Sequence, residues 1–351
     1  MQALNEKEWK DVELGKIADV HSGRDIYAQE RTDGGTPYVT AGTANNGIGY
    51  FVGNSNDSLA QNAISVNRNG AVGEAFYHPY KALYGNDCRR VNLRQADDPL
   101  TQLFVAQCIS TQKKTFSYSR KLGTARLKRL HVMLPIDDKG EPDYDYMAQY
   151  ASTMRGGMLM RYKNYVAGQL SQLEYKDIPA LNEKEWEHFL IPDIFSKIQR
   201  GKRLKNADHI PGEVPYVSST ASNNGVDDYI EASHGTRVFE NCISLANSGS
   251  VGTAFYEPFS FVASDHVTSL KRDKTSKFTY LFLASVIEKQ GSNFNFNREI
   301  NDLRIKKMQV MLPIDDKGEP DYAYMEQYAK NMMLRKYERY LAFLDRRENK
   351  A

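Results

Sequence analysis

Short apolar runs alternate with clusters of Gly, Asn, Asp and Pro along most of the chain, a pattern typical of many short β-strands joined by tight turns. The clearest case is residues 133–144, MLPIDDKGEPDY. A β-like run ends at Pro135, a polar turn follows, and Pro142-Asp143 suits the first turn of a helix, where proline is tolerated and a carboxylate complements the dipole. The same twelve residues recur at 311–322. The repetition predicts two copies of one domain, each followed by a helix.

Other segments repeat in the same order and predict the elements inside each copy. Residues 100–111 and 278–289 carry apolar residues at three- and four-residue steps, which predicts one helix per copy. The remaining matched segments are Glu8-Trp9 with Glu185-Trp186, Gly23-Arg24 with Gly201-Lys202, Pro37-Tyr38-Val39 with Pro215-Tyr216-Val217, Ile64-Ser65-Val66 with Ile243-Ser244-Leu245, the turns Gly70–Gly73 with Gly249–Gly252, and Ala75-Phe76-Tyr77 with Ala254-Phe255-Tyr256.

The longest periodic stretches follow the repeated turn. One apolar face carries Met147, Ala151, Met154, Met158, Tyr162, Val166 and Leu173, and its counterpart carries Met325, Ala329, Met332, Tyr340 and Leu344, interrupted by Lys336. Such stripes are typical of helix–helix seams, so we expect the two helices to pack antiparallel as a coiled-coil-like spacer. Gly156-Gly157 and Gly168 favour a bend in the first helix.

These elements define the expected architecture. We predict a mixed α/β (α+β) fold with two repeated domains, each followed by a long helix. The expected boundaries are 1–141 for the first domain, 142–179 for its helix, 180–319 for the second domain and 320–351 for its helix.

Composition and charge then limit the function classes. The 351 residues are 41% hydrophobic and 11% aromatic, which is typical of a folded protein with room for two domains. The formal net charge of +2 means that any nucleic-acid surface must be local. The three cysteines are far apart and form no disulfide framework, and neither a signal peptide nor a membrane span is present. A cytoplasmic protein that does not contact membranes is the expectation.

Residues 113–130 are the most informative polar stretch. They hold seven basic residues, no acidic residue, and the aromatics Phe116 and Tyr118. Residues 291–308 retain basic residues at four matching positions. Retained cations suit phosphates, whereas positions that differ, such as Ser117/Asn295 and Ser119/Asn297, are candidates for base edges. The alternative to DNA contact is that these basic residues are solvated surface charges around the last strand of each copy.

Two further groups complete the candidate DNA contacts. Amides of the Asn-Gly loops could read bases or could be structural turns, and Arg68, held by a glycine turn, is expected to point outward where the second copy has Asn247. The full set of candidates is Arg24, Asn45, Asn46, Arg68, Ser117, Tyr118, Ser119, Arg120, Lys121, Arg126, Lys128, Lys202, Arg203, Lys205, Asn223, Asn224, Asn247, Asn295, Asn297, Arg298, Arg304 and Lys306.

Signals for catalysis or metal binding are absent. The seven histidines show no metal-ligand spacing, and the chain contains no P-loop and no GxSxG elbow. Glu174-Tyr175-Lys176 has the ExK form of half a nuclease motif, but it is expected to end a long helix and has no repeated partner. We therefore expect a reader of DNA without a catalytic site.

With its repeated segments in this order, the chain resembles the DNA-specificity subunits of bacterial restriction–modification systems. The resemblance spans essentially the whole chain, and the LPIDDKGEPDY turn and short length look more like BcgI-type, type IIB subunits than type I subunits. It implies two target-recognition domains that each read half of a bipartite double-stranded DNA site. It also implies helices that set the gap and dock methyltransferase and nuclease subunits. S-adenosylmethionine and magnesium would belong to those partners, with no cofactor in this chain.

Three alternatives stay open at this point. The chain could be a type I rather than a type IIB specificity subunit, a stand-alone DNA-binding regulator, or a nuclease with an unrecognised site. The recognised bases and the subunit stoichiometry are not encoded in any motif.

Overall fold

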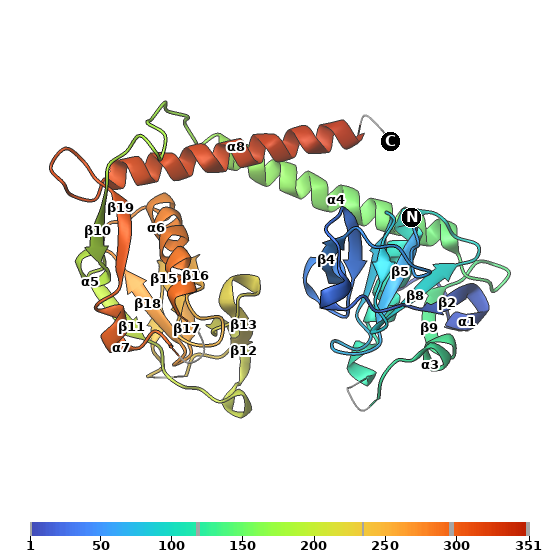
Figure 1. The fold of residues 1–351 in the computed structure, drawn as a ribbon. Helices are drawn as coiled ribbons and strands as arrows, with labels where there is room; N and C mark the ends of the chain where they lie inside the picture. The colour runs from blue at the N-terminus through green and yellow to red at the C-terminus, as the bar shows by residue number, and fades with distance from the viewer. Residues whose placement is uncertain (1, 117–119, 234, 295–297, 349–351) are drawn as a thin grey trace. The chain divides into compact units, whose positions relative to one another are not determined.

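A computed structural model describes residues 2–116, 120–233, 235–294 and 298–348 (Figure 1). Contacts between Cα atoms divide the chain into two units, Met1–Tyr162 (unit 1) and Lys163–Ala351 (unit 2). The division lies inside α4 (Tyr144–Leu170), the first of two long helices. Each unit is a mixed α/β domain, as the sequence predicts.

Unit 1 is built from short strands in three sheets. An antiparallel sheet has the order β2-β8-β5-β6, a smaller sheet has the order β4-β3-β7 with β3 and β7 parallel, and β1 pairs with β9. The strands are β1 (Trp9–Glu13), β2 (Ala18–Ser22), β3 (Thr36–Val39), β4 (Ile48–Val52), β5 (Ala63–Asn67), β6 (Ala75–His78), β7 (Leu83–Tyr84), β8 (Cys88–Leu93) and β9 (His131–Pro135). The helices before α4 are α1 (Leu14–Ile17), α2 (Pro99–Ser110) and α3 (Thr124–Lys128), with 3-10 turns η1 (Ala28–Glu30), η2 (Ala44–Gly47) and η3 (Lys113–Thr115).

Unit 2 repeats this plan. Its sheets have the orders β11-β18-β15-β16, β13-β12-β17-β14 and β10-β19. The strands are β10 (Trp186–Leu190), β11 (Lys197–Arg200), β12 (Pro211–Val217), β13 (Val226–Ile230), β14 (Val238–Phe239), β15 (Cys242–Ala246), β16 (Ala254–Glu257), β17 (Phe261–Ala263), β18 (Val267–Lys271) and β19 (Gln309–Pro313). The helices are α5 (Ile191–Ile194), α6 (Lys277–Lys289), α7 (Asp302–Ile305) and α8 (Tyr322–Glu348), with 3-10 turns η4 (Asn206–Asp208), η5 (Asn223–Gly225) and η6 (Gln290–Asn293).

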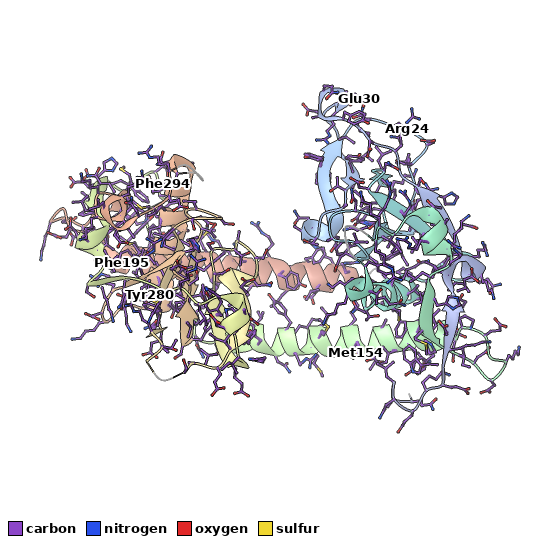
Figure 2. All side chains as sticks on the ribbon, turned by 90° about the horizontal axis from the view of Figure 1, so that it is seen from below. Arg24, Glu30, Met154, Phe195, Tyr280 and Phe294 are labelled. Atoms are coloured by element: carbon purple, nitrogen blue, oxygen red, sulfur yellow. The ribbon has the colours of Figure 1, made fainter. Side chains whose placement is uncertain are left out.

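The main core of each unit lies between its four-stranded antiparallel sheet and one helix. In unit 1, α2 packs against β6 and β9, and Ile109 and Leu134 are almost fully buried between them. In unit 2, α6 covers β16, with Tyr280 stacked on Tyr256 at 5.1 Å between ring centroids; Figure 2 shows Tyr280 inside this unit. Helices that bury an apolar face against a sheet gain most of their stability from that burial.

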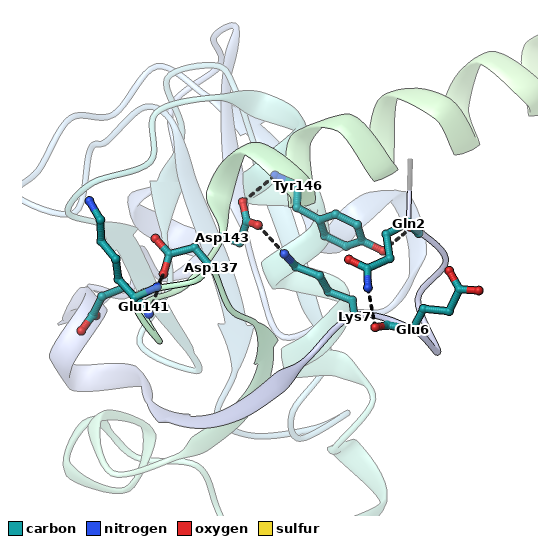
Figure 3. Close-up of polar contacts among 8 residues, drawn as sticks. Gln2, Glu6, Lys7, Asp137, Glu141, Asp143 and Tyr146 are labelled. Atoms are coloured by element: carbon teal, nitrogen blue, oxygen red, sulfur yellow. Dashed lines mark hydrogen bonds and ion pairs between the residues drawn. The ribbon is translucent and has the colours of Figure 1, made fainter.

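The start of each long helix is fixed in the core of its unit. Met147 and Met325, in the first turns of α4 and α8, are both 0% exposed. The Asp143 carboxylate accepts a hydrogen bond from the Tyr146 N–H at 2.9 Å and pairs with Lys7 Nζ at 2.6 Å, as Figure 3 shows. A carboxylate that caps a helix N-terminus satisfies an otherwise unpaired N–H and complements the dipole.

The same clip recurs at α8. Asp321 accepts from the Tyr324 N–H at 2.9 Å, and Lys184 pairs with it at 2.9 Å. Because the clip joins the opening segment of each copy to its long helix, both copies fix helix and domain by the same contacts.

Two expectations about the long helices need correction. Each helix has 27 residues, and α4 ends at Leu170, so Leu173 lies beyond the helix and not on its stripe. Gly156, Gly157 and Gly168 do not interrupt α4, since the described backbone stays helical through them. No helix among the described residues is long and apolar enough to cross a membrane.

Candidate nucleic-acid interface

The basic segment of unit 1 surrounds an open basin of about 580 Å³. Figure 1 places α3 at the end of unit 1 away from α4. Besides Gly123, Thr124 and Ala125, the basin is lined by four cationic side chains, Arg68, Lys121, Arg126 and Arg129. The Arg126 guanidinium donates to the Lys121 carbonyl, which fixes one wall. Lys128 is exposed on the same short helix but does not line the basin.

An arginine stacked on an aromatic ring is repeated beside this segment in both units. The Arg120 guanidinium lies 5.8 Å from the centre of the Phe116 ring, and Arg298 lies 5.7 Å from the centre of the Phe294 ring. Both arginines are exposed. A guanidinium held over a ring keeps its donors directed at solvent, which suits contacts to phosphates or base edges.

The matching segment of unit 2 keeps some of these cations. The Arg304 guanidinium donates to the Glu299 carbonyl at 2.7 Å, as Arg126 does to Lys121, and Lys306 is exposed. The same contact between an arginine and a carbonyl five residues earlier therefore recurs in both units, although the charges around it differ.

The Asn-Gly loops present amides at the surface. Asn45, Asn46, Asn223 and Asn224 are exposed and have positive φ angles of 50–53°. Asparagine tolerates this left-handed conformation better than most residues, so a structural reason for these residues exists beside the functional one.

The basic residues after the first glycine step are also exposed. They are Arg24, Lys202, Arg203 and Lys205. Arg24 lies 3.5 Å from Asp57 Oδ1 and stays 67% exposed, so this ion pair holds it weakly; Figure 2 shows it near Glu30 at the edge of unit 1.

The structure corrects the expectations for Arg68 and Asn247. Arg68 is half-buried and donates to the Asn86 carbonyl at 3.4 Å, so it lines the basin and does not project outward. Asn247 is 1% exposed and accepts a hydrogen bond from Thr268 at 2.9 Å, so its amide does not reach solvent and the prediction of a base contact is wrong for this residue. Both residues directly follow a buried strand. The sequence pattern predicts a turn there, but it does not show whether the side chain of the turn faces solvent or packs against a neighbouring segment.

Five candidates lie outside the described residues, namely Ser117, Tyr118, Ser119, Asn295 and Asn297. One basin residue, Arg129, is absent from the list of single candidate contacts. It belongs, with Lys307, to the four retained basic positions that the sequence assigns to phosphates.

A buried titratable pair occupies the same strand position in each unit. Ser65 Oγ lies 2.9 Å from His78 Nε2, and Ser244 donates to Glu257 Oε1 at 2.9 Å. Burial lowers the pKa of His78 to about 4 and raises the pKa of Glu257 to about 7. Both titratable side chains are 0% exposed, so neither pair can reach a substrate and both are structural.

The remaining chemical candidates do not converge on a site. Glu174-Tyr175-Lys176 lies after α4 rather than at its end, where the Asn331 amide bonds both the N–H and the carbonyl of Lys176. No group of three or more His, Cys, Asp or Glu residues suited to a metal ion occurs in the described part of the chain. A duplicated domain with exposed basic and amide residues repeated in both copies defines a DNA-recognition protein.

Comparisons with known proteins identify the family. The type I restriction modification DNA specificity domain matches twice, over residues 6–155 and 183–340. The specificity subunit S.BcgI of a type II restriction enzyme from Heyndrickxia coagulans is 31% identical over 92% of this chain and 91% of its own length. S.MpnORF507P of Mycoplasma pneumoniae, named as a type I specificity subunit, is 24% identical over 85% and 83%. The crystal structure of a type I S subunit from M. genitalium covers all of this chain and 96% of its own with 16% identity and a TM-score of 0.46.

The chain belongs to the restriction–modification DNA specificity family, whose domain it contains twice. It is a specificity subunit, the non-enzymatic component that recognises the DNA target of a restriction–modification system. Such subunits bind DNA and assemble with other subunits of their systems.

Proposed function

We propose that the two units read two halves of one bipartite double-stranded DNA site, one half-site per unit. The observation that carries this proposal is the repeated arginine-over-phenylalanine pair, at 5.8 and 5.7 Å, beside a basic segment in each unit. Two equivalent readers on one chain call for two reading positions on one duplex.

The two long helices form an antiparallel, coiled-coil-like spacer that sets the distance between half-sites. Contacts inside unit 2 support this arrangement, because the end of α4 meets α8 through Lys163–Asp345 at 3.9 Å and Tyr165–Tyr337 at 6.4 Å between rings. A later residue of α4 thus meets an earlier residue of α8, which is the antiparallel sense. At about 1.5 Å per residue, a helix of 27 residues spans about 40 Å, slightly more than one turn of B-DNA.

The partners are methyltransferase and nuclease subunits, which supply S-adenosylmethionine and magnesium chemistry that this chain does not hold. Exposed methionines on α4 favour such docking: Met154 and Met158, one helical turn apart, are 45% and 60% exposed, and Met160, on another side of the helix, is 62% exposed. Figure 2 labels Met154 on this helix. Large exposed methionines are typical of binding surfaces. The greater identity to the BcgI subunit than to the type I relative favours a type IIB system, acting in the cytoplasm.

Exchange of differing residues between the units tests the reading of half-sites. Binding sites are selected from a random duplex library by the full chain with its partner subunits. Ser117→Asn with Ser119→Asn should change one half-site and leave the other intact, and the reciprocal Asn295→Ser with Asn297→Ser should change only the second. Each disturbed base pair should cost about 1–3 kcal/mol. Equal loss at both half-sites in either variant would contradict independent reading.

A further inference from the structure

The basin of unit 1 has a stronger positive field than the matching place in unit 2, and three equivalent positions account for the difference. Strand pairing shows which residues are equivalent in the two units. Val66 of β5 pairs with Arg89 in unit 1, and its counterpart Leu245 of β15 pairs with Thr268 in unit 2, so Arg89 is equivalent to Thr268. Arg68 directly follows β5 and Asn247 directly follows β15, so these two residues are also equivalent.

These paired positions are cationic in unit 1 and neutral in unit 2. Burial is the main cause that lowers the pKa of Arg89, and the positive charge of the nearby Arg68 is the second. In unit 2 the same two positions hold Asn247 and Thr268, joined by a hydrogen bond of 2.9 Å. A pair of like charges in unit 1 thus becomes a neutral, hydrogen-bonded pair in unit 2.

The rim of the basin differs in the same direction. Lys121 of unit 1 corresponds to Glu299 of unit 2, because each supplies the carbonyl that the wall arginine contacts. Ser22 and Thr124 of unit 1 contact each other through their hydroxyl groups at 3.2 Å.

At the positions of these two hydroxyl residues, unit 2 carries Arg200 and Asp302, whose charged groups lie 4.0 Å apart. Residues 113–130 carry seven basic and no acidic residues, whereas residues 291–308 carry four basic and two acidic residues. The net charges of the two segments are therefore +7 and +2.

The arginines of the basin also lack local neutralisation. Within the described residues, no carboxylate lies in ion-pair range of Arg68, Arg126 or Arg129. Arg68 is half-buried, and a partly desolvated charge without a counter-charge is costly until an anion arrives. A tetrahedral phosphodiester offers acceptors that several guanidinium groups can share.

We propose that the basin lined by Arg68, Lys121, Arg126 and Arg129 binds a backbone phosphate of the DNA, and that unit 2 lacks an equivalent phosphate site. This inference rests on the proposed function and adds an asymmetry to it. Unit 1 supplies most of the binding to DNA that depends on salt and not on sequence. Unit 2 neutralises fewer phosphates and therefore releases fewer counterions from the DNA.

The test measures binding of the full chain to a fluorescein-labelled 40-base-pair duplex of random sequence by anisotropy, over a range of KCl concentrations. Arg126→Gln with Arg129→Gln should lower the magnitude of the log–log salt slope by about one unit, the value expected when one phosphate is no longer neutralised. The matched pair Arg304→Gln with Lys307→Gln should lower it by less than half as much.

Two controls complete the design. Lys139→Gln with Lys317→Gln removes two exposed charges from the repeated turns and should leave the slope unchanged. Glu299→Lys gives unit 2 the residue that unit 1 has at the equivalent position, Lys121. It should increase the magnitude of the salt slope. Thermal melting confirms that each variant folds.

The outcomes distinguish failure of the phosphate site from failure of the proposed function. An unchanged slope in the Arg126/Arg129 variant, or an equal fall in the Arg304/Lys307 variant, overturns the asymmetric phosphate site while wild-type binding keeps the proposed function. Failure of the wild-type chain to bind duplex DNA overturns both.

Discussion

The buried carboxyl group of Glu257 should make unit 2 less stable at alkaline pH than at acidic pH. Its side chain is 0% exposed, Oε1 accepts from Ser244, and Oε2 has no hydrogen-bond partner among the described residues. Burial raises the pKa from 4.5 to about 7 in the folded state. Between these values the folded protein holds a proton that the unfolded chain has lost, so stability falls as pH rises from 4.5 to 7 and stays low above it.

The expected magnitude follows from the shift. About 2.5 pKa units at about 1.4 kcal/mol per unit give a loss of about 3.5 kcal/mol at pH 8. Glu257→Gln resembles the protonated acid and should remove this loss. At pH 8 the variant should gain about 3.5 kcal/mol, or about 7–14 °C in Tm for a unit of this size. At pH 4.5 it should match its parent.

The chain offers a clean assay, because each unit contains one tryptophan. In a Trp9→Phe background, Trp186 alone reports unfolding of unit 2, where its indole packs on Phe282 at 6.4 Å between rings. Urea unfolding is followed by fluorescence at pH 5 and pH 8, with Glu213→Gln as an exposed control. Identical differences between Glu257→Gln and its parent at both pH values would refute the reasoning.

Four other predictions follow from the same structure. In a Trp186→Phe background, acidification from pH 6.5 to 4 should destabilise unit 1 by about 3 kcal/mol in urea unfolding, because the pKa of His78 is about 4 when folded; His78→Gln should remove this dependence, and parallel curves would contradict it. Asp143→Ala should cost unit 1 about 1–2 kcal/mol in the same assay and Asp143→Asn less, since Asn still caps the helix; equal costs would assign the whole effect to the ion pair. Four alanines inserted after Met158 should lengthen the preferred spacer by about one or two base pairs in a random-spacer selection, and an unchanged spacer excludes the helix as the ruler. The purified chain with S-adenosylmethionine, magnesium and duplex DNA should neither methylate nor cleave, and activity that persists through rigorous purification would contradict this.

Local chemistry explains which elements the sequence predicts well. In the repeated turn, the Asp137 carboxylate accepts from the N–H groups of Lys139 and Glu141, and Gly140 has a φ of 76°. All of these interactions lie within five residues, so the pattern of residues is enough to predict the turn and the helix that follows. The pairing of β1 with β9 joins segments more than a hundred residues apart, and no local pattern contains that information.

The candidate interface was predicted only in part, for a related reason. Periodicity identifies the apolar face of α4 but not what covers it: Met147 and Val166 are fully buried, whereas Met158 is 60% exposed. Likewise, the glycine turn locates Arg68 and Asn247, but their burial depends on Asn86, in the turn before β8, and on Thr268 in β18. Residue type therefore gave the chemistry of these positions and not their accessibility.

The pairing of the first and last strands has a consequence for how such proteins change. Because Glu13 lies opposite His131, the chain enters and leaves the body of unit 1 at neighbouring points. Residues 14–130 thus begin and end at a two-stranded stem and share one core with Leu134 and Met147, while the clip between Lys7 and Asp143 lies outside them. Recombination at the stem can replace residues 14–130 with others that keep the apolar contacts to Leu134 and Met147, and leave the length of α4 as it was. A new target sequence can then arise in one step, without renewed selection for assembly.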